Sequence, residues 1–377
     1  MVRMNVNCIL IQFILFSLVL FPFIGVTAAD DGPVTITDDL GRTITLDKPA
    51  DRIGYTRYNV AEAIKLIDAW DKVVARDGTI SDPTLCPINP KFYPNLEKIP
   101  AISDPNDFFT LDYEKIMEIK PEVMIIPCTT DVSVDRIQEV IDTLEPEIPV
   151  VALNFDSPVS MGDTIVKLGQ ITGNEEEAQQ YLDFYNEIYS TIKEKTDSLP
   201  GDEKPEVFLK MAGFTPDALY TLGKENDYWN QMIAVCGGDS ISSDLSGAYI
   251  EVDKEWLINQ DMDAIVAYIW DQYYPETFGF SATDPAHKNE NGPKIVDEIS
   301  AMDVFSQTEA VTNDDVFLLD GNLFTTPRVI VGMAYLAKWL HPELFNDLNP
   351  QEIHQKYLTQ FIGADYNLND VGLFGYP

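Results

Sequence analysis

The chain is poor in basic residues, and this shortage limits the partners that it can bind. It carries 25 lysines and arginines against 62 acidic residues, which gives a formal net charge of −37. A surface this acidic repels phosphate backbones and anionic lipid head groups, so we expect no nucleic-acid partner. The excess of acids favours solubility, and it is compatible with adaptation to salt.

Histidine is scarce as well. The three histidines, His287, His341 and His354, all fall in the second half of the chain. A site for bare Zn²⁺ or Mn²⁺ usually combines several histidines with a carboxylate, which disfavours a carrier of free metal ions. His341 precedes a proline at an expected helix end, where a cation is favourable without any ligand role. The sequence therefore predicts no metal ligands.

The four cysteines fit no CxxC metal site. Cys86, Cys128 and Cys236 lie beyond the N-terminal region, and an odd number leaves at least one free thiol. Cys86 and Cys128 could pair in an oxidising compartment, or all three could remain partly buried thiols.

Catalytic motifs are missing too. The sequence contains no G-x-S-x-G elbow, no phosphate-binding G-x-x-x-x-G-K and no G-x-G-x-x-G after a strand. Paired carboxylates remain open in so acidic a chain, but nothing singles out one pair. The sequence therefore predicts a binding protein without catalytic residues or cofactor, and not an enzyme.

Only one long apolar run is present, at residues 9–24, and it is the N-terminal feature of interest. Its length of about 16 residues is short for a membrane span, which needs about 20. Arg3 precedes it, and small residues at 26–29 follow before two aspartates. This layout predicts a secretory signal peptide over residues 1–29 and an exported, extracytoplasmic mature chain. An uncleaved N-terminal anchor is the alternative.

Behind this segment, short apolar strands alternate with amphipathic helices in two series. Such alternation predicts parallel sheets covered on both faces. A long polar stretch over 77–109 is expected to be irregular. Strands are expected at 34–37, 43–46, 52–55, 73–75, 123–126, 150–153, 207–209, 264–270 and 316–319. Helices are expected at 60–70, 112–119, 133–144, 161–171, 228–235, 254–258, from 294, and from Thr326 as N-cap to His341.

One long helix separates the two series. Residues 175–198 place apolar side chains at helical spacing, and a Leu-Pro-Gly cluster ends the segment. The predicted fold class is α/β, with two Rossmann-like lobes joined by one rigid helix. We expect the first lobe at 30–172, the linker helix at 173–199 and the second lobe at 200–377.

Short motifs occur in a fixed order along the chain. They are 37–46 with Pro49 and 52–53, 113–116 leading to 119–123, 148–151, 168–169 with 172–173, 237–238, 326–328 and 340–343. In order and spacing they resemble the ABC-importer binding proteins for ferric siderophores, haem and cobalamin. Residues 55–62 are bulkier than the family's Ser/Ala-rich segment, and 77–109 and 271–292 are longer, which leaves the ligand open.

The resemblance implies an extracytoplasmic, monomeric solute-binding protein. Such a protein captures an iron–siderophore, haem or corrinoid-type metal chelate in a cleft between its lobes and delivers it to an ABC permease. A sensor or scaffold of the same fold is the alternative function. Family members dock on the permease through one acid on each lobe, which here implies Glu97 and Asp239, although an acid-rich chain offers many substitutes.

Ligand-contacting residues are expected beyond the carboxyl ends of the parallel strands. Aromatic faces there suit a flat chelate, and guanidinium groups suit its carboxylates. The two candidate arginines, Arg57 and Arg328, could instead form structural ion pairs with the many acids. The predicted ligand-binding residues are Tyr55, Arg57, Tyr58, Thr129, Thr130, Phe214, Trp270, Tyr273, Tyr274 and Arg328.

Overall fold

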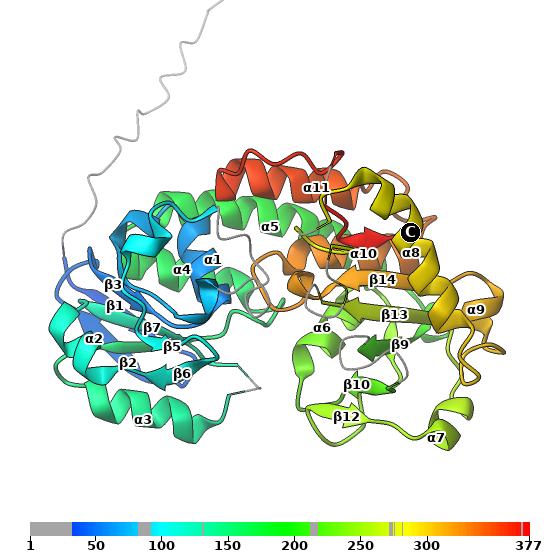
Figure 1. Ribbon diagram of the computed structural model, residues 1–377, viewed down its shortest axis with the longest axis horizontal. Coiled ribbons are helices and arrows are strands. Elements are labelled where there is room, and N and C mark those ends of the chain that lie inside the picture. The colour runs from blue at the N-terminus through cyan, green and yellow to red at the C-terminus, as the bar shows by residue number, and fades with distance from the viewer. Residues whose placement is uncertain are drawn as a thin grey trace, which may run out of the picture. The chain divides into compact units, whose positions relative to one another are not determined.

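The computed structural model describes residues 32–81, 92–129, 132–211, 218–270, 274, 276–280, 282–370 and 372–377, without the side chains of 81 and 285–288. The predicted signal peptide lies outside these ranges, as do Cys86, Thr130, Phe214 and Tyr273. The described part contains two α/β lobes joined by a long helix, as the alternation of strands and helices predicts (Figure 1). None of its helices combines the length and apolarity needed to cross a membrane.

The first lobe is built on a parallel four-stranded sheet. In spatial order its strands are β4 (Val73–Ala75), β3 (Ile53–Tyr55), β7 (Val123–Pro127) and β8 (Val150–Leu153). Its helices are α1 (Tyr58–Leu66), α2 (Tyr113–Ile119), α3 (Val134–Leu144) and α4 (Met161–Thr172). Ile125 of β7 packs with residues of α1 and α4, whereas Met124 and Ile126 pack with residues of α2 and α3. Helices therefore cover both faces, which explains the continuous apolar strands.

Two hairpins accompany this sheet. The predicted hairpin is confirmed as β1 (Val34–Thr37) and β2 (Thr43–Leu46), and the Asp38 carboxylate in its turn accepts the backbone N–H of Arg42 at 2.8 Å. The expectation that 77–109 is irregular is wrong in part, because β5 (Ser103–Asp104) and β6 (Asp107–Leu111) form a second hairpin. The sequence does not reveal this hairpin, because exposed polar residues interrupt the alternation of apolar and polar side chains and because β5 is short.

The second lobe has a five-stranded sheet. Its order is β11 (Asp239–Ser240), β9 (Glu206–Met211), β13 (Ala264–Ile269), β14 (Val316–Asp320) and β15 (Gly375–Tyr376). The first four strands are parallel and β15 is an antiparallel edge, a chain-terminal strand that the sequence did not predict. The remaining elements are β10 (Tyr220–Leu222), β12 (Tyr249–Glu251), α6 (Asp227–Val235), α7 (Lys254–Ile258), α8 (Pro285–Ser300), α9 (Glu309–Thr312), α10 (Val329–Leu340) and α11 (Pro350–Tyr357).

The predicted linker helix is α5 (Glu175–Thr196), whose 22 residues span about 33 Å at 1.5 Å per residue. It is not the only bridge between the lobes. The chain returns through α11 and the following π-helical turn η7 (Leu358–Ile362), which contacts α1 of the first lobe. Phe361 of this turn packs against Tyr181 and Phe184 of α5, with ring centroids 5.4 and 5.1 Å apart. Figure 1 shows α11 lying along α5.

Two helix starts differ from the sequence prediction. Helix α8 begins nine residues before position 294, at Pro285, and accommodates Pro293 in its interior. Helix α10 begins at Val329 with Arg328 as its N-cap residue, so the assignment of Thr326 as N-cap is wrong. The Thr326 hydroxyl instead accepts the backbone N–H of Arg328 at 3.2 Å, a local turn that holds the residues before the helix.

Candidate ligand-binding site

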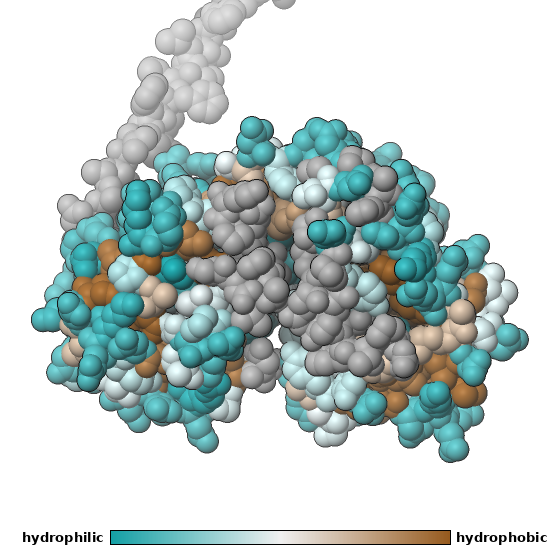
Figure 2. Space-filling model, viewed as in Figure 1, coloured by the Kyte–Doolittle hydropathy of each residue, from teal (hydrophilic) through white to brown (hydrophobic). Residues whose placement is uncertain are grey.

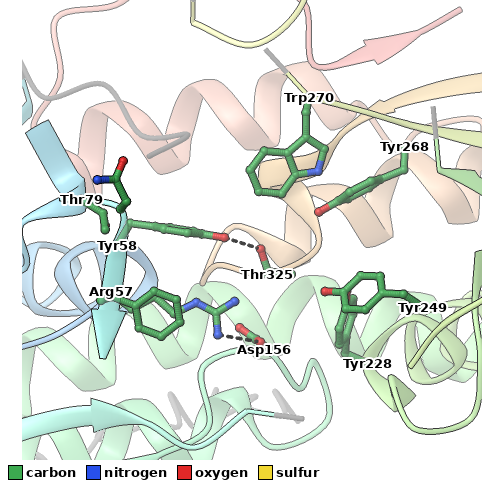
Figure 3. A pocket seen from close by; sticks show the side chains of 11 residues that line it. Arg57, Tyr58, Thr79, Asp156, Tyr228, Tyr249, Tyr268, Trp270 and Thr325 are labelled. Carbon is green, nitrogen blue, oxygen red and sulfur yellow. Dashed lines mark hydrogen bonds and ion pairs between the residues drawn. The ribbon is translucent and has the colours of Figure 1, made fainter. Parts of the chain in front are cut away.

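A pocket of about 230 Å³ lies where the carboxyl ends of the two sheets face each other. Figure 3 shows side chains of both lobes pointing toward the same space. Six of the lining residues are aromatic, and they come from both lobes. The lining consists of Arg57, Tyr58, Thr79, Asn106, Phe108 and Asp156 of the first lobe and Tyr228, Tyr249, Tyr268, Trp270 and Thr325 of the second.

Arg57 adopts an unusual backbone conformation at the start of α1. Its φ of 70° and ψ of 144° place it in a region that residues with a β-carbon rarely occupy. Such strain costs on the order of 1–3 kcal/mol and concentrates at ligand sites. The conformation turns the Arg57 side chain into the pocket, so the strain itself marks this residue as a functional candidate.

The Arg57 guanidinium is engaged on several sides. Its Nη1 donates to the Thr129 hydroxyl at 2.7 Å and lies 3.7 Å from the Asp156 carboxylate. Its central carbon lies 5.1 Å from the ring centroid of Phe108 and 5.7 Å from that of Tyr58. Arg57 is therefore held by an ion pair and by two aromatic rings. The sequence predicts that Arg57 meets an anionic ligand group. Such a group would also lie near the Asp156 carboxylate.

Tyr58 connects the two lobes across the pocket. A hydrogen bond of 3.1 Å joins its hydroxyl to that of Thr325, which follows β14 in the second lobe (Figure 3). Both residues are buried. Because the bond crosses from one lobe to the other, any widening of the pocket at this point has to break it.

The second lobe contributes a cluster of aromatic rings. Tyr268 and Trp270, at and just beyond the end of β13, have centroids 5.7 Å apart in an edge-on arrangement. A Cβ at Gly321 would come within 2.6 Å of the Trp270 indole nitrogen, so the glycine makes room for that ring. Burial, together with the nearby Tyr58 and Tyr249, raises the pKa of Tyr268 well above its usual range. The Tyr268 hydroxyl therefore stays protonated and can donate a hydrogen bond at neutral pH.

Arg328 lies elsewhere, in a buried ion pair that also joins the lobes. Its Nε donates to the Glu62 carboxylate of α1 at 2.7 Å, and the two side chains are 1% and 2% exposed. The Tyr357 hydroxyl of α11 donates to the same carboxylate at 2.6 Å. Burial and the Glu62 charge raise the pKa of Tyr357 well above its usual range, which keeps this donor protonated. The structural ion pair considered for Arg328 is thus the arrangement found.

The structure brings together part of the predicted site. Arg57, Tyr58 and Trp270 line the pocket, and Thr129 holds Arg57. Tyr55, Tyr274 and Arg328 are not in its described lining. Tyr55 is fully buried in β3 with its ring 6.0 Å from that of Trp70, and Tyr274 packs against the second lobe's core. Thr130, Phe214 and Tyr273 lie outside the described residues.

The sequence reasoning missed eight lining residues: Thr79, Asn106, Phe108, Asp156, Tyr228, Tyr249, Tyr268 and Thr325. Three of them could have been found by the rule already applied, since Asp156, Tyr268 and Thr325 lie at or just after strand ends. Asn106 and Phe108 depend on the unpredicted hairpin. Nothing in the sequence marked Tyr228 and Tyr249 as pocket residues, because Tyr228 lies at the start of helix α6 and Tyr249 lies in the short strand β12.

The predicted docking acids are both exposed, Glu97 in the first lobe and Asp239 on the edge strand β11 of the second. On the face seen in Figure 2, hydrophilic residues are spread over both lobes between smaller hydrophobic patches. Glu97 and Asp239 thus have the exposure that docking requires, and many other acids share it.

Among the described residues, no three His, Cys, Asp or Glu side chains gather in a way that could hold a metal ion. Cys128 and Cys236 are free thiols. Burial, with the charges of Asp39 and Asp38, raises the pKa of the Cys128 thiol to about 11. Neither cysteine lines the pocket.

Solved structures of low sequence identity share this fold. The TroA-like periplasmic binding protein FepB of Veillonella parvula is 20% identical, with a TM-score of 0.72 over 91% of this chain and 99% of that one. The Haemophilus influenzae protein MolA, bound to molybdate, is 17% identical, with a TM-score of 0.66 over 88% and 99%. Staphylococcus aureus IsdE, complexed with haem, is 19% identical, with a TM-score of 0.53 over 77% and 98%.

Sequence comparison identifies the family. No curated protein matches the chain at a significant level. A family model described as periplasmic binding protein, however, matches residues 53–323, which is most of the chain. Both sheets apart from β15, the linker helix and nearly all of the pocket lie within this match. The chain therefore belongs to the periplasmic binding protein family, whose members are extracytoplasmic solute-binding proteins of ABC importers and not enzymes.

Proposed function

We propose that this chain captures a metal chelate of the iron–siderophore, haem or corrinoid type between its lobes and delivers it to an ABC permease. The observation that carries the proposal is the aromatic lining of the pocket, with six rings contributed by both lobes. Aromatic side chains give a large contact area and have few rotamers to immobilise, which suits the flat or conjugated surface of a chelate. A chelate also supplies the donors to its own metal, so the protein needs only to bind the organic shell.

The pocket is small for a chelate and has to widen to hold one. Pockets for drug-sized ligands have volumes of roughly 300–1,000 Å³, and this pocket measures about 230 Å³. We propose that loading a chelate separates Tyr58 from Thr325, the hydrogen-bonded pair that spans the pocket. The two helical bridges, α5 and the α11–η7 return, keep this separation small.

Structures of similar fold do not identify the ligand. One is bound to molybdate and another to haem, and a shared fold leaves the choice of ligand to the residues of the site. In this chain the aromatic lining favours a chelate over a small oxyanion. Arg57, the basic residue among the described lining, already has Asp156 beside it, which weakens its attraction for a free anion.

The proposal extends to export and docking. We propose that residues 1–29 are a signal peptide, that the lobes divide at 30–172 and 200–377 around a linker at 173–199, and that the mature protein is a monomer. Docking on the permease would then use one exposed acid from each lobe, Glu97 and Asp239.

The test starts from protein purified from its own source. Its visible spectrum and native mass should reveal a bound chelate, and titration with ferric trihydroxamates, haem and cobalamin should give saturable binding. The variants Arg57→Ala and Tyr58→Ala should weaken the binding about tenfold to a hundredfold, the range expected when a buried side chain that contacts the ligand is removed together with its hydrogen bonds. Unchanged binding in both variants would place the site elsewhere, and exclusive binding of a bare metal ion or an uncharged sugar would refute the ligand class.

A further inference from the structure

We propose that Asp156 determines which cargo charge the pocket accepts. By pairing with Arg57 it makes the described lining electrically neutral, so that the pocket takes neutral or cationic chelates and disfavours anionic ones. This inference rests on the proposed function, because it narrows the class of chelate bound at the same site.

The first observation is the balance of charge. Among the described residues that line the pocket, Arg57 and Asp156 are the charged ones, and they carry opposite signs. Their nearest charged atoms are 3.7 Å apart, and the two side chains are only 6% and 5% exposed. Water therefore screens the pair little, and each charge is felt by a ligand together with the other.

The second observation is that neighbours fix both members of the pair. Arg57 donates to the Thr129 hydroxyl at 2.7 Å. Asp156 accepts the side-chain amide of Asn59 at 2.8 Å, and its own backbone N–H donates to Asn154 at 2.9 Å. The carboxylate therefore cannot swing away without losing an ion pair and a hydrogen bond.

An anionic ligand group gains little from this arrangement. If it approaches Arg57 closely, it also comes close to the Asp156 carboxylate, and the repulsion opposes the attraction because both fall slowly with distance. If it displaces Asp156 instead, it leaves a buried carboxylate without its cation, which is strongly unfavourable.

The aromatic rings act in the opposite direction. The face of each ring carries partial negative charge and attracts cations, most effectively where water is excluded. Tyr228, Tyr268 and Trp270 present such rings on the second-lobe side of the pocket (Figure 3). The net charge of −37 adds a longer-range attraction for cations, screened beyond about 10 Å by salt. Within the described lining, a neutral or cationic chelate therefore meets no net opposing charge.

The experiment compares affinities for three iron(III) chelates: the monocationic trihydroxamate ferrioxamine B, the neutral trihydroxamate ferrichrome and the trianionic tris-catecholate complex. The wild-type protein should bind one of the trihydroxamates at least about tenfold more tightly than the tris-catecholate. Asp156→Asn keeps the side-chain shape and removes the carboxylate that lies 3.7 Å from Arg57. It should shift the anion-to-cation affinity ratio about tenfold to a hundredfold toward the anion.

Two further variants isolate the pocket charge. Asp163→Asn makes the same change of formal charge at an exposed position of α4 outside the lining, and it should leave the ratio unchanged. Arg57→Gln removes the cation and leaves Asp156, so it should move the ratio toward the cation even if Asp156→Asn fails to fold.

The outcomes separate this inference from the proposed function. Tightest wild-type binding of the tris-catecholate, or equal ratios in Asp156→Asn and Asp163→Asn, would overturn the role of Asp156 while chelate capture stands. If the protein binds none of the three iron(III) chelates and neither haem nor cobalamin, both this inference and the proposed function are overturned.

Discussion

The strained backbone of Arg57 allows its structural cost and its binding role to be measured separately. Replacing Arg57 by alanine removes the side chain but leaves a β-carbon at φ 70° and ψ 144°. Replacing it by glycine removes the same contacts to Thr129 and Asp156 and also relieves the strain, because glycine adopts positive φ without steric conflict. Both variants should therefore lose ligand affinity equally, while their stabilities differ.

The expected difference follows from two opposing contributions. A residue with a β-carbon in this region costs about 1–3 kcal/mol. Glycine loses more backbone entropy on folding, which costs about 0.5–1 kcal/mol relative to alanine. The net result is that Arg57→Gly should be more stable than Arg57→Ala by about 1 kcal/mol, within a range of about 0–2.5 kcal/mol.

Urea unfolding followed by far-UV circular dichroism measures this difference as a shift in midpoint at equal slope. The matched control is Asn186, exposed in the middle of α5, where glycine should be less stable than alanine by about 1 kcal/mol. If glycine is less stable than alanine at position 57 by the same margin as at position 186, the backbone at position 57 is not strained and the assignment of Arg57 from its conformation is wrong.

The remaining predictions concern the ion pair that joins the lobes, the movement of the lobes on ligand binding, the reactivity of one thiol, and export. Arg328→Met should destabilise the protein by about 3–5 kcal/mol, because it strands the buried Glu62 carboxylate, and Glu62→Leu in the same chain should restore part of that loss in thermal unfolding. X-ray scattering profiles with and without ligand should nearly coincide; a change of several ångströms in radius of gyration, whether a drop or a rise, would contradict the rigid linker. Burial and neighbouring aspartates raise the pKa of Cys128 to about 11, so its thiolate fraction at pH 8 and its alkylation rate, followed by peptide mass, should be roughly a hundredfold below those of an ordinary cysteine. N-terminal sequencing of exported protein should begin at residue 29 or 30, and a start at Met1 would refute cleavage.

The fold was predictable because its signals are local. The apolar runs of β7 and β8 and the periodicity of α5 each require only a few consecutive residues to be recognised, and their order implies two parallel sheets around a linker. The error in the predicted start of α10 has a local cause as well. Thr326 and Pro327 form a good start signal, but the Thr326 hydroxyl caps the turn before the helix and not the helix itself.

The site was predictable only where one rule applied. Residues directly after a strand could be named, and Arg57, Tyr58 and Trp270 do line the pocket. The rule says nothing about pairs from distant segments. The partnership of Arg57 with Asp156 joins positions 99 residues apart in sequence, and only the folded sheet shows that the expected anion-binding arginine is already compensated.

The same reasoning explains why the relation between the lobes could not be read from the sequence. Glu62 of α1, Arg328 before α10 and Tyr357 of α11 are polar residues in separate segments, and each would be expected at the surface. Together they form one buried cluster, since Arg328 and Tyr357 both donate to the Glu62 carboxylate. Tyr181 of the linker helix completes it by donating to the carbonyl oxygen of Pro327 at 2.6 Å. This cluster ties both lobes and the linker beside the segment that carries Thr325. Small rotations about it would therefore be felt first at the hydrogen bond between Thr325 and Tyr58, which places the control of pocket width at the lobe junction and not in the linker alone.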